Sequence, residues 1–384
     1  MTGPSPFLRV LDLTDELGAN AVRLFVGMGA DVLRLRSTTD PEPEDAAGLH
    51  WYAGTRTHTV PEADLDRVIG ELVRDADIVL ESGPRPALRT VRLRDECPAA
   101  WEHVAHAVLT PFGLTGPRRD WGGDDNVIAA AGGMTWLGGR PGEAPIAPPY
   151  DQASQLAGTH LAIAALLAAL ATKRTGHGQL AEVSAQESVA ATLETGAISW
   201  IHAGSVPTRT GGVYGHVAHR IFPTADGYVA GGYSGPDRMW TDLLAWLDET
   251  GEAEDLTDPV WTDPVHRWKN RGHVDEVVTA WTRRRRTAEI APEARRRALP
   301  WAEVAAPEEL PDNPQLRARD FFTQLDTPGG PRLDAGFPYE SPGRPRPVTL
   351  PAPEPARVTA FSPADGAIAP SAGEKAVTRA GSGA

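Results

Sequence analysis

The sequence predicts an α/β protein whose large, Rossmann-like domain is a parallel sheet with helices on both faces. Residues 8–110 alternate short apolar runs with helical segments. A further apolar run at residues 180–183 leads directly into a well-capped helix. A glycine-rich stretch then begins a region with a different residue pattern, for which we expect a smaller α+β domain.

The first part of the chain contains four candidate strands, at residues 9–13, 32–35, 77–81 and 103–109. Helical segments separate them, as a parallel sheet requires. The turn after the first strand, residues 14–18, lacks the glycine fingerprint of dinucleotide sites. A hydride-transferring NAD enzyme is therefore not expected.

The most apolar segment, residues 156–170, is rich in alanine. It is shorter than the roughly 20 residues that span a bilayer, so we predict a helix buried against the sheet and no membrane partner. Small side chains let such a helix pack closely on its neighbours.

The chemistry is expected at residues 180–187. Ser184 followed by Glu187 is a capping-box pattern, which places a helix start near Ala185. Glu182, at the end of the preceding strand, has no such capping role. The positive helix terminus keeps a carboxylate ionised, so Glu182 is a candidate nucleophile or base.

The chain is expected to divide into four segments, a division that the family resemblance given below also implies. We predict a large domain over residues 1–200, a small domain over 201–305, a return to the large domain over 306–342 and a disordered tail over 343–384. Within the small domain, residues 221–223 and 228–231 flank a turn and predict a hairpin, and residues 240–246 predict a helix. The arginine runs at 283–286 and 295–297 are interpreted as solvated helix faces.

Bulk properties exclude some classes of partner. A net charge of -14 over 384 residues argues against unspecific nucleic-acid binding. The lone Cys97 cannot form an intrachain disulfide, and with no signal-like start it predicts a cytoplasmic protein. The scattered histidines give no metal-binding spacing.

Several motifs in order resemble the class III CoA-transferases, the family of formyl-CoA transferase, carnitine CoA-transferase and α-methylacyl-CoA racemase. Residues 175–187 follow the family pattern Thr-Gly-x-Gly-Gln-x-x-Asp-Val-Ser, with Glu182 at the Asp position. Asp151 is similar to the Asp that precedes the family's long apolar helix. Residues 11–14, 29–35, 112–117 and 308–322 match further family segments.

The resemblance implies CoA transfer between an acyl-CoA and a carboxylic acid through a covalent intermediate on Glu182. It also implies an interlocked homodimer and a glycine-rich lid, for which Gly211, Gly212 and Gly215 are the candidates, with Tyr214 beside them. An interdomain linker is the alternative interpretation of that stretch.

The CoA-binding segments of the family are only partly matched. Of the family's Asn-Arg-Gly-Lys-Arg-Ser, this chain keeps Gly54 and Arg56, and Arg34, Arg36 and Arg85 are further candidates for phosphate contacts. Each of these arginines taken alone is more often a surface residue, whereas a cluster of them around one cleft would favour phosphate binding.

Asp124 occupies the position of the racemase histidine, so racemisation is disfavoured. Because Glu replaces Asp and the CoA segments differ, a noncatalytic CoA-binding or partner-binding paralogue is a second hypothesis. An acyl-CoA isomerase of the same family is a third.

Overall fold

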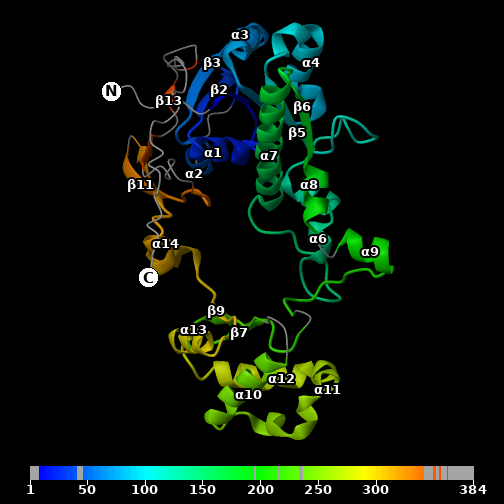
Figure 1. Cartoon of the computed structure of the whole chain (residues 1–384), viewed down its shortest axis with the longest axis vertical. Helices are drawn as coiled ribbons and strands as arrows, with labels where there is room; N and C mark the ends of the chain where they lie inside the picture. The colour runs from blue at the N-terminus through cyan, green and yellow to red at the C-terminus, as the bar shows by residue number, and fades with distance from the viewer. Residues whose placement is uncertain are drawn as a thin grey trace, which may run out of the picture.

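The computed structural model has two lobes connected by two stretches of chain (Figure 1). It describes residues 8–40, 46–193, 196–213, 216–232, 237–327, 329–340, 349–351, 354–355 and 361. The strands of the large sheet are β1 (Arg9–Leu13), β2 (Asp31–Ser37), β3 (Arg56–Val60), β4 (Ile78–Ser82), β5 (Ala105–Thr110), β6 (Leu180–Ser184) and β13 (Glu354–Pro355). The helices of this lobe are α1 (Ala19–Gly27), α2 (Ala46–Tyr52), α3 (Leu65–Leu72), α4 (Arg89–Glu96), α5 (Asp125–Ala131), α6 (Met134–Leu137), α7 (Gln152–Thr175), α8 (Ala185–Thr192) and α9 (Ala197–Ala203).

All pairings in the large sheet are parallel, in the order β13-β3-β2-β1-β4-β5-β6. The run from β3 to β6 is the strand order of doubly wound nucleotide-binding folds. In this order the connections change direction between β1 and β4. A crevice therefore forms at the carboxyl ends of these two strands, where such folds bind ligands.

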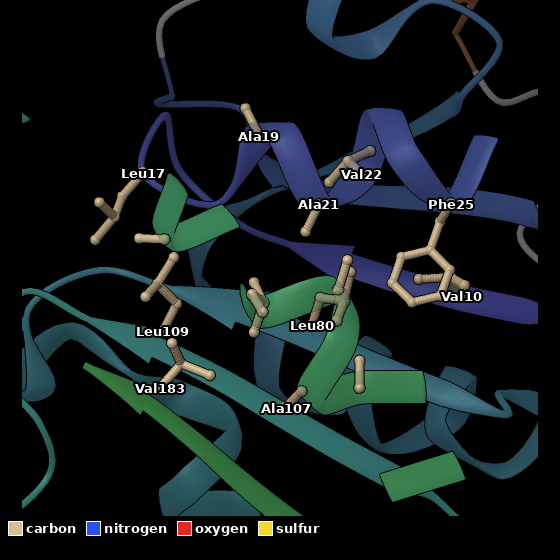
Figure 2. Close-up of a cluster of buried hydrophobic side chains, with 14 of the residues drawn as sticks. Val10, Leu17, Ala19, Ala21, Val22, Phe25, Leu80, Ala107, Leu109 and Val183 are labelled. Atoms are coloured by element: carbon tan, nitrogen blue, oxygen red, sulfur yellow. The ribbon is translucent and has the colours of Figure 1, made fainter. Parts of the chain in front are cut away.

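Alternate residues of the strands face two different cores. On one face, Val10 and Leu80 pack with Phe25 of α1 and Leu161 of α7. On the other, Leu11 packs with the apolar stripe of α3. Figure 2 shows the first of these cores, with α1 lying over the sheet. The predicted α/β class is confirmed, as are the strands at 9–13 and 180–183 to within a residue.

Helix α7 is long and apolar enough to cross a membrane by length and composition alone. Its inner face, with Ala157, Leu161 and Ala165, is fully buried in the core of the large lobe. Gly158 lets it approach α1 closely, since a Cβ there would lie 2.9 Å from the Cβ of Asn20. This packing is that of a core helix, while Ile163, Leu167 and Leu170 stay exposed on its outer face.

The second lobe has its own core around a small antiparallel sheet, in the order β7-β8-β9. The predicted hairpin is present, with Ile221 paired to Ala230, and so is the predicted helix within α10. The elements of this lobe are β7 (Ile221–Pro223), β8 (Tyr228–Ala230), β9 (Ala302–Glu303), α10 (Arg238–Glu249), α11 (Pro264–Lys269), α12 (Arg271–Thr282) and α13 (Thr287–Arg296).

After α14 (Pro314–Ala318), the chain packs back against α1. Strands β10 (Thr323–Thr327), β11 (Gly330–Asp334) and β12 (Thr349–Pro351) form a second small sheet. Phe337 is buried in the core of the large lobe, and the Tyr339 hydroxyl donates a hydrogen bond to the Leu24 carbonyl.

Two predictions need correction here. The segment expected to be a CoA loop, residues 52–57, ends α2 and begins β3, a strand that the polar sequence did not indicate. The expected disorder of residues 343–384 is wrong for β12 and β13, which pair with β10 and β3, and for Phe361, which is buried. These short pieces find pairing partners and apolar pockets on the large lobe despite their sparse apolar content.

Candidate active site

A cavity of about 1110 Å³ opens at the carboxyl ends of β1, β2 and β4, where the sheet topology predicts a ligand site. Residues 14–17 follow β1, Arg34 and Arg36 lie on β2, and Ser82 ends β4. The opposite wall comes from the start of α5 and of α7. Trp51 and Tyr52 of α2 add aromatic surface.

Carboxylates dominate the lining of this cavity. The six acidic lining residues are Asp15, Glu16, Asp40, Asp124, Asp125 and Asp151. Four of them accept hydrogen bonds from backbone N–H groups: Asp15 from Leu17, Asp40 from Ser37, Asp124 from Val127 and Asp125 from Ser154. These four hold loops and helix ends in place.

Like Glu16, Asp151 is exposed, and its carboxylate makes no hydrogen bond to the described residues. It is the residue before α7, yet it does not cap that helix with its side chain. Asp125 does so instead, accepting a hydrogen bond from the Ser154 N–H at 2.7 Å. The Asp151 carboxylate therefore stands beside the positive end of a 24-residue helix with its oxygens available for chemistry.

The opposite corner of the cavity is cationic. Arg34 stacks on the Tyr52 ring, with its guanidinium carbon 3.3 Å from the ring centroid. Its Nη1 lies 3.6 Å from Asp12 Oδ2. Burial raises the pKa of the Asp12 carboxyl, and Arg34 and the Thr14 N–H oppose that effect. Arg36, also buried, lines the same corner.

Glu182 lies elsewhere. It is exposed on the edge strand β6, is absent from the lining of the cavity, and accepts a hydrogen bond from the Leu114 N–H. Gly113 makes room for this contact, since a Cβ there would come within 3.1 Å of Glu182 Oε1. The neighbouring prediction was accurate, because Ser184 Oγ caps α8 by accepting from the Glu187 N–H.

The other predicted CoA contacts also fall outside the cavity. Gly54, at φ +80°, fits between Val26 and Leu350. Arg56 pairs with Asp31 at 2.7 Å, near the amino ends of β3 and β2, and Arg85 pairs with Asp120 at 2.8 Å. The structure thus brings together Arg34, Arg36 and Asp124, and separates Gly54, Arg56, Arg85 and Glu182 from them.

The predicted lid rests on another loop. The Gly211 N–H donates to the Gly139 carbonyl at 3.1 Å, and Arg209 Nη1 donates to the Trp136 carbonyl at 3.0 Å. Gly211 and Gly212 do not line the cavity in the described part of the chain. Tyr214 and Gly215 lie outside the described residues.

Comparison with known proteins identifies the family. The sequence pattern of CoA-transferase family III matches residues 8–357. This chain belongs to CoA-transferase family III.

Two similar proteins are named as CoA-transferases. Succinyl-CoA:(R)-benzylsuccinate CoA-transferase subunit BbsE of Thauera aromatica is 32% identical over 86% of this chain and 87% of its own length. Succinyl-CoA–D-citramalate CoA-transferase of Chloroflexus aurantiacus is 27% identical over 85% of this chain and 84% of its own. Among solved structures, a CAIB/BAIF family protein from Brucella suis has the same fold, with a TM-score of 0.79 at 22% identity over 92% of this chain and 97% of its own.

The predicted nucleophile Glu182 and the cavity lie at different places along the sheet. Glu182 lies on β6, the edge strand, whereas the cavity lies where the connections change direction between β1 and β4. The sequence does contain an indication that Asp151 is not needed as a cap. Asp151 directly precedes the longest apolar helix, and a second acidic residue, Asp125, caps that helix.

Proposed function

We propose that this family III chain transfers CoA between an acyl-CoA and a carboxylic acid, and that Asp151 is the carboxylate that carries the intermediate. The support for Asp151 is its position: it lines the cavity, at a helix N-terminus, with oxygens that make no hydrogen bond to the described residues. Glu182 remains the alternative nucleophile, supported by its place in a family motif.

The chemistry needs only a carboxylate and a dry pocket. An Asp151 oxygen attacks the thioester carbonyl, the carbon–sulfur bond breaks, and CoA leaves as the thiolate, giving a mixed anhydride. The thiolate then attacks the aspartyl carbonyl and releases the donor acid, leaving an aspartyl-CoA thioester. The acceptor carboxylate attacks this thioester, and the thiolate returns to the acceptor carbonyl, which frees Asp151.

The relatives suggest the substrate class. Their names specify succinyl-CoA with benzylsuccinate or citramalate, and a further relative from Agrobacterium fabrum is named succinate–glutarate CoA-transferase. These acids all carry two carboxylates. We therefore propose a dicarboxylic acyl-CoA as donor and a carboxylic acid as acceptor, with CoA as the co-substrate.

Turnover by matched variants tests the assignment. Asp151→Asn should lower thioester exchange from succinyl-CoA at least about 1000-fold, because the amide cannot form the anhydride. Glu182→Gln should retain activity within about tenfold, and Glu71→Gln, on an exposed face of α3, is the control. Loss of activity in Glu182→Gln with turnover kept in Asp151→Asn would move the nucleophile to Glu182. Retained CoA binding without turnover in the native chain would instead favour the noncatalytic paralogue.

We also propose a homodimer. Apolar side chains are exposed on the outer face of α7 and on α9, among them Leu167 at 61% and Ile201 at 70%. Exposed apolar surface of this extent is typical of an interaction site. We propose that the two chains interlock, as the family resemblance implies. We also propose a cytoplasmic location, which the lone Cys97 supports.

A further inference from the structure

Four buried polar atoms without hydrogen-bond partners gather at the ends of β1 and β2. Among the described residues these are Asp12 Oδ2, Thr14 Oγ1, and Nε and Nη1 of Arg34. Asp12 Oδ2 and Arg34 Nη1 face each other as an ion pair at 3.6 Å, so the atoms left for a ligand are Thr14 Oγ1 and Arg34 Nε. Thr14 and Arg34 both line the cavity, so a ligand can pair with these two atoms.

Arg34 is held in place but is not saturated. Arg34 is 8% exposed, and the Tyr52 ring stacks on its guanidinium and fixes the plane of that group. The Nη1 contact with Asp12 is 3.6 Å long, and Nη2 reaches the Thr14 carbonyl only at 3.5 Å. These distances lie beyond good hydrogen bonds, so the guanidinium keeps donor capacity for an oxygen anion.

The charges of the cavity restrict what that anion can be. Six carboxylates and two arginines line it, and the buried Asp12 offsets part of the Arg34 charge, so negative charge is least unfavourable near Arg34 and Arg36. A diphosphate or a 3′-phosphate beside six carboxylates would be repelled. A single carboxylate placed against Arg34 would be held, with the remainder of its acyl chain directed toward the acidic wall that contains Asp151.

We propose that Arg34, with the Thr14 hydroxyl, binds the second carboxylate of a dicarboxylic acyl group and so selects such acyl-CoA substrates. This inference rests on the proposed CoA transfer in the cavity and assigns Arg34 to the acyl group, where the sequence had suggested the phosphates of CoA. The orientation that follows places the thioester end of the acyl chain toward α7.

Binding of two unreactive CoA thioethers tests the inference without requiring turnover. S-(3-carboxypropyl)-CoA and S-butyl-CoA differ only in a terminal carboxylate, and calorimetry gives the affinity of each. The native protein should prefer the carboxylated thioether by about tenfold or more, in line with a charge-assisted hydrogen bond. Arg34→Gln should abolish that preference and leave S-butyl-CoA binding within about twofold, while Arg92→Gln, an exposed ion-pair residue of α4, should behave as the native chain.

Three results would overturn the proposal. One is equal affinity of the native protein for the two thioethers, and another is an undiminished preference in Arg34→Gln. The third is a similar loss for both thioethers and for CoA itself in Arg34→Gln, which would assign Arg34 to a phosphate. If Arg34→Gln melts at a much lower temperature than the native chain, Arg34→Lys keeps the charge and should retain part of the preference. Because no bond is made or broken, an inactive Asp151 variant can show the same preference, so failure of transfer is separable from failure of this site.

Discussion

Some polar side chains of this protein are fully hydrogen-bonded within the fold, and others are not. Glu81, buried at the end of β4, accepts hydrogen bonds from the Arg89 and Thr90 N–H groups at the start of α4. Thr90 Oγ1 links this carboxylate to His106 Nε2, 2.7 Å away on β5. Such residues are structural, whereas Arg34 keeps buried donors without hydrogen-bond partners and Asp151 is an exposed carboxylate at the cavity. Asp151 and Arg34 are the groups proposed to act on a ligand.

His106 gives a prediction on acid stability. Burial lowers the pKa of His106 to about 3, while an unfolded histidine titrates near 6.5. Below pH 6.5 the unfolded chain therefore binds a proton that the folded chain does not, so its contribution to stability is present above pH 6.5 and is lost as the pH falls. Between pH 7 and pH 5 the free energy of unfolding should fall by about 2 kcal/mol more in the native protein than in His106→Gln.

Urea unfolding at the two pH values measures this difference. Glu81 acts in the opposite direction, since burial raises the pKa of its carboxyl, but it is present in both proteins. Equal pH dependence of the native chain and His106→Gln would show that His106 is not held neutral.

Helices and strands were predictable where apolar periodicity was strong. The five strands from β1 to β6 that have apolar runs lie within about two residues of their predicted positions, and α10 follows its tryptophan spacing. Strand β3 was missed because Arg56, Thr57 and His58 resemble a loop, and its pairing with β2 comes from tertiary context. The cavity was predicted only in part: Arg34, Arg36 and Asp124 line it, but its position depends on strand order, which local pattern does not contain.

The segment that follows β11 packs on α1 through Phe337, and we predict how much this packing contributes to stability. Phe337 is 1% exposed and lies against Gly27, and the Arg23 guanidinium is 4.6 Å from its ring centroid. Phe337→Ala should cost about 3–5 kcal/mol, seen as an earlier urea transition of the large lobe. Leu333→Ala, at an exposed site in β11, should change it by less than about 0.5 kcal/mol. Equal effects of the two variants would mean that the segment does not hold the large lobe together.

At the scale of the whole molecule, two lobes with separate cores are joined by two stretches of chain (Figure 1). The cavity belongs to the large lobe alone among the described residues. The ion pairs of the arginine runs, such as Arg285 with Glu252 and Arg297 with Glu249, stay within the small lobe. A second copy would give the exposed apolar face of α7 a partner.

The proposed dimer can be tested by a charge on that face. Leu167→Glu should turn a dimer into a monomer in light scattering, because a carboxylate cannot be buried unpaired in an apolar interface. Val260→Glu, at a 49% exposed site in the small lobe, is the control and should leave the mass unchanged. A native monomer would refute the dimer. Co-purification with a different chain of similar size would instead show a hetero-oligomer.

Asp151 is the proposed reacting carboxylate, and chemical trapping tests it most directly. Incubation of the native protein with succinyl-CoA, followed by borohydride reduction and peptide mass spectrometry, locates the thioester directly, because reduction converts the modified carboxyl to an alcohol. We expect the reduced residue in the peptide containing Asp151, and we expect it to be lost in Asp151→Asn. A reduced residue at Glu182, or no modified carboxylate at all, would contradict this assignment.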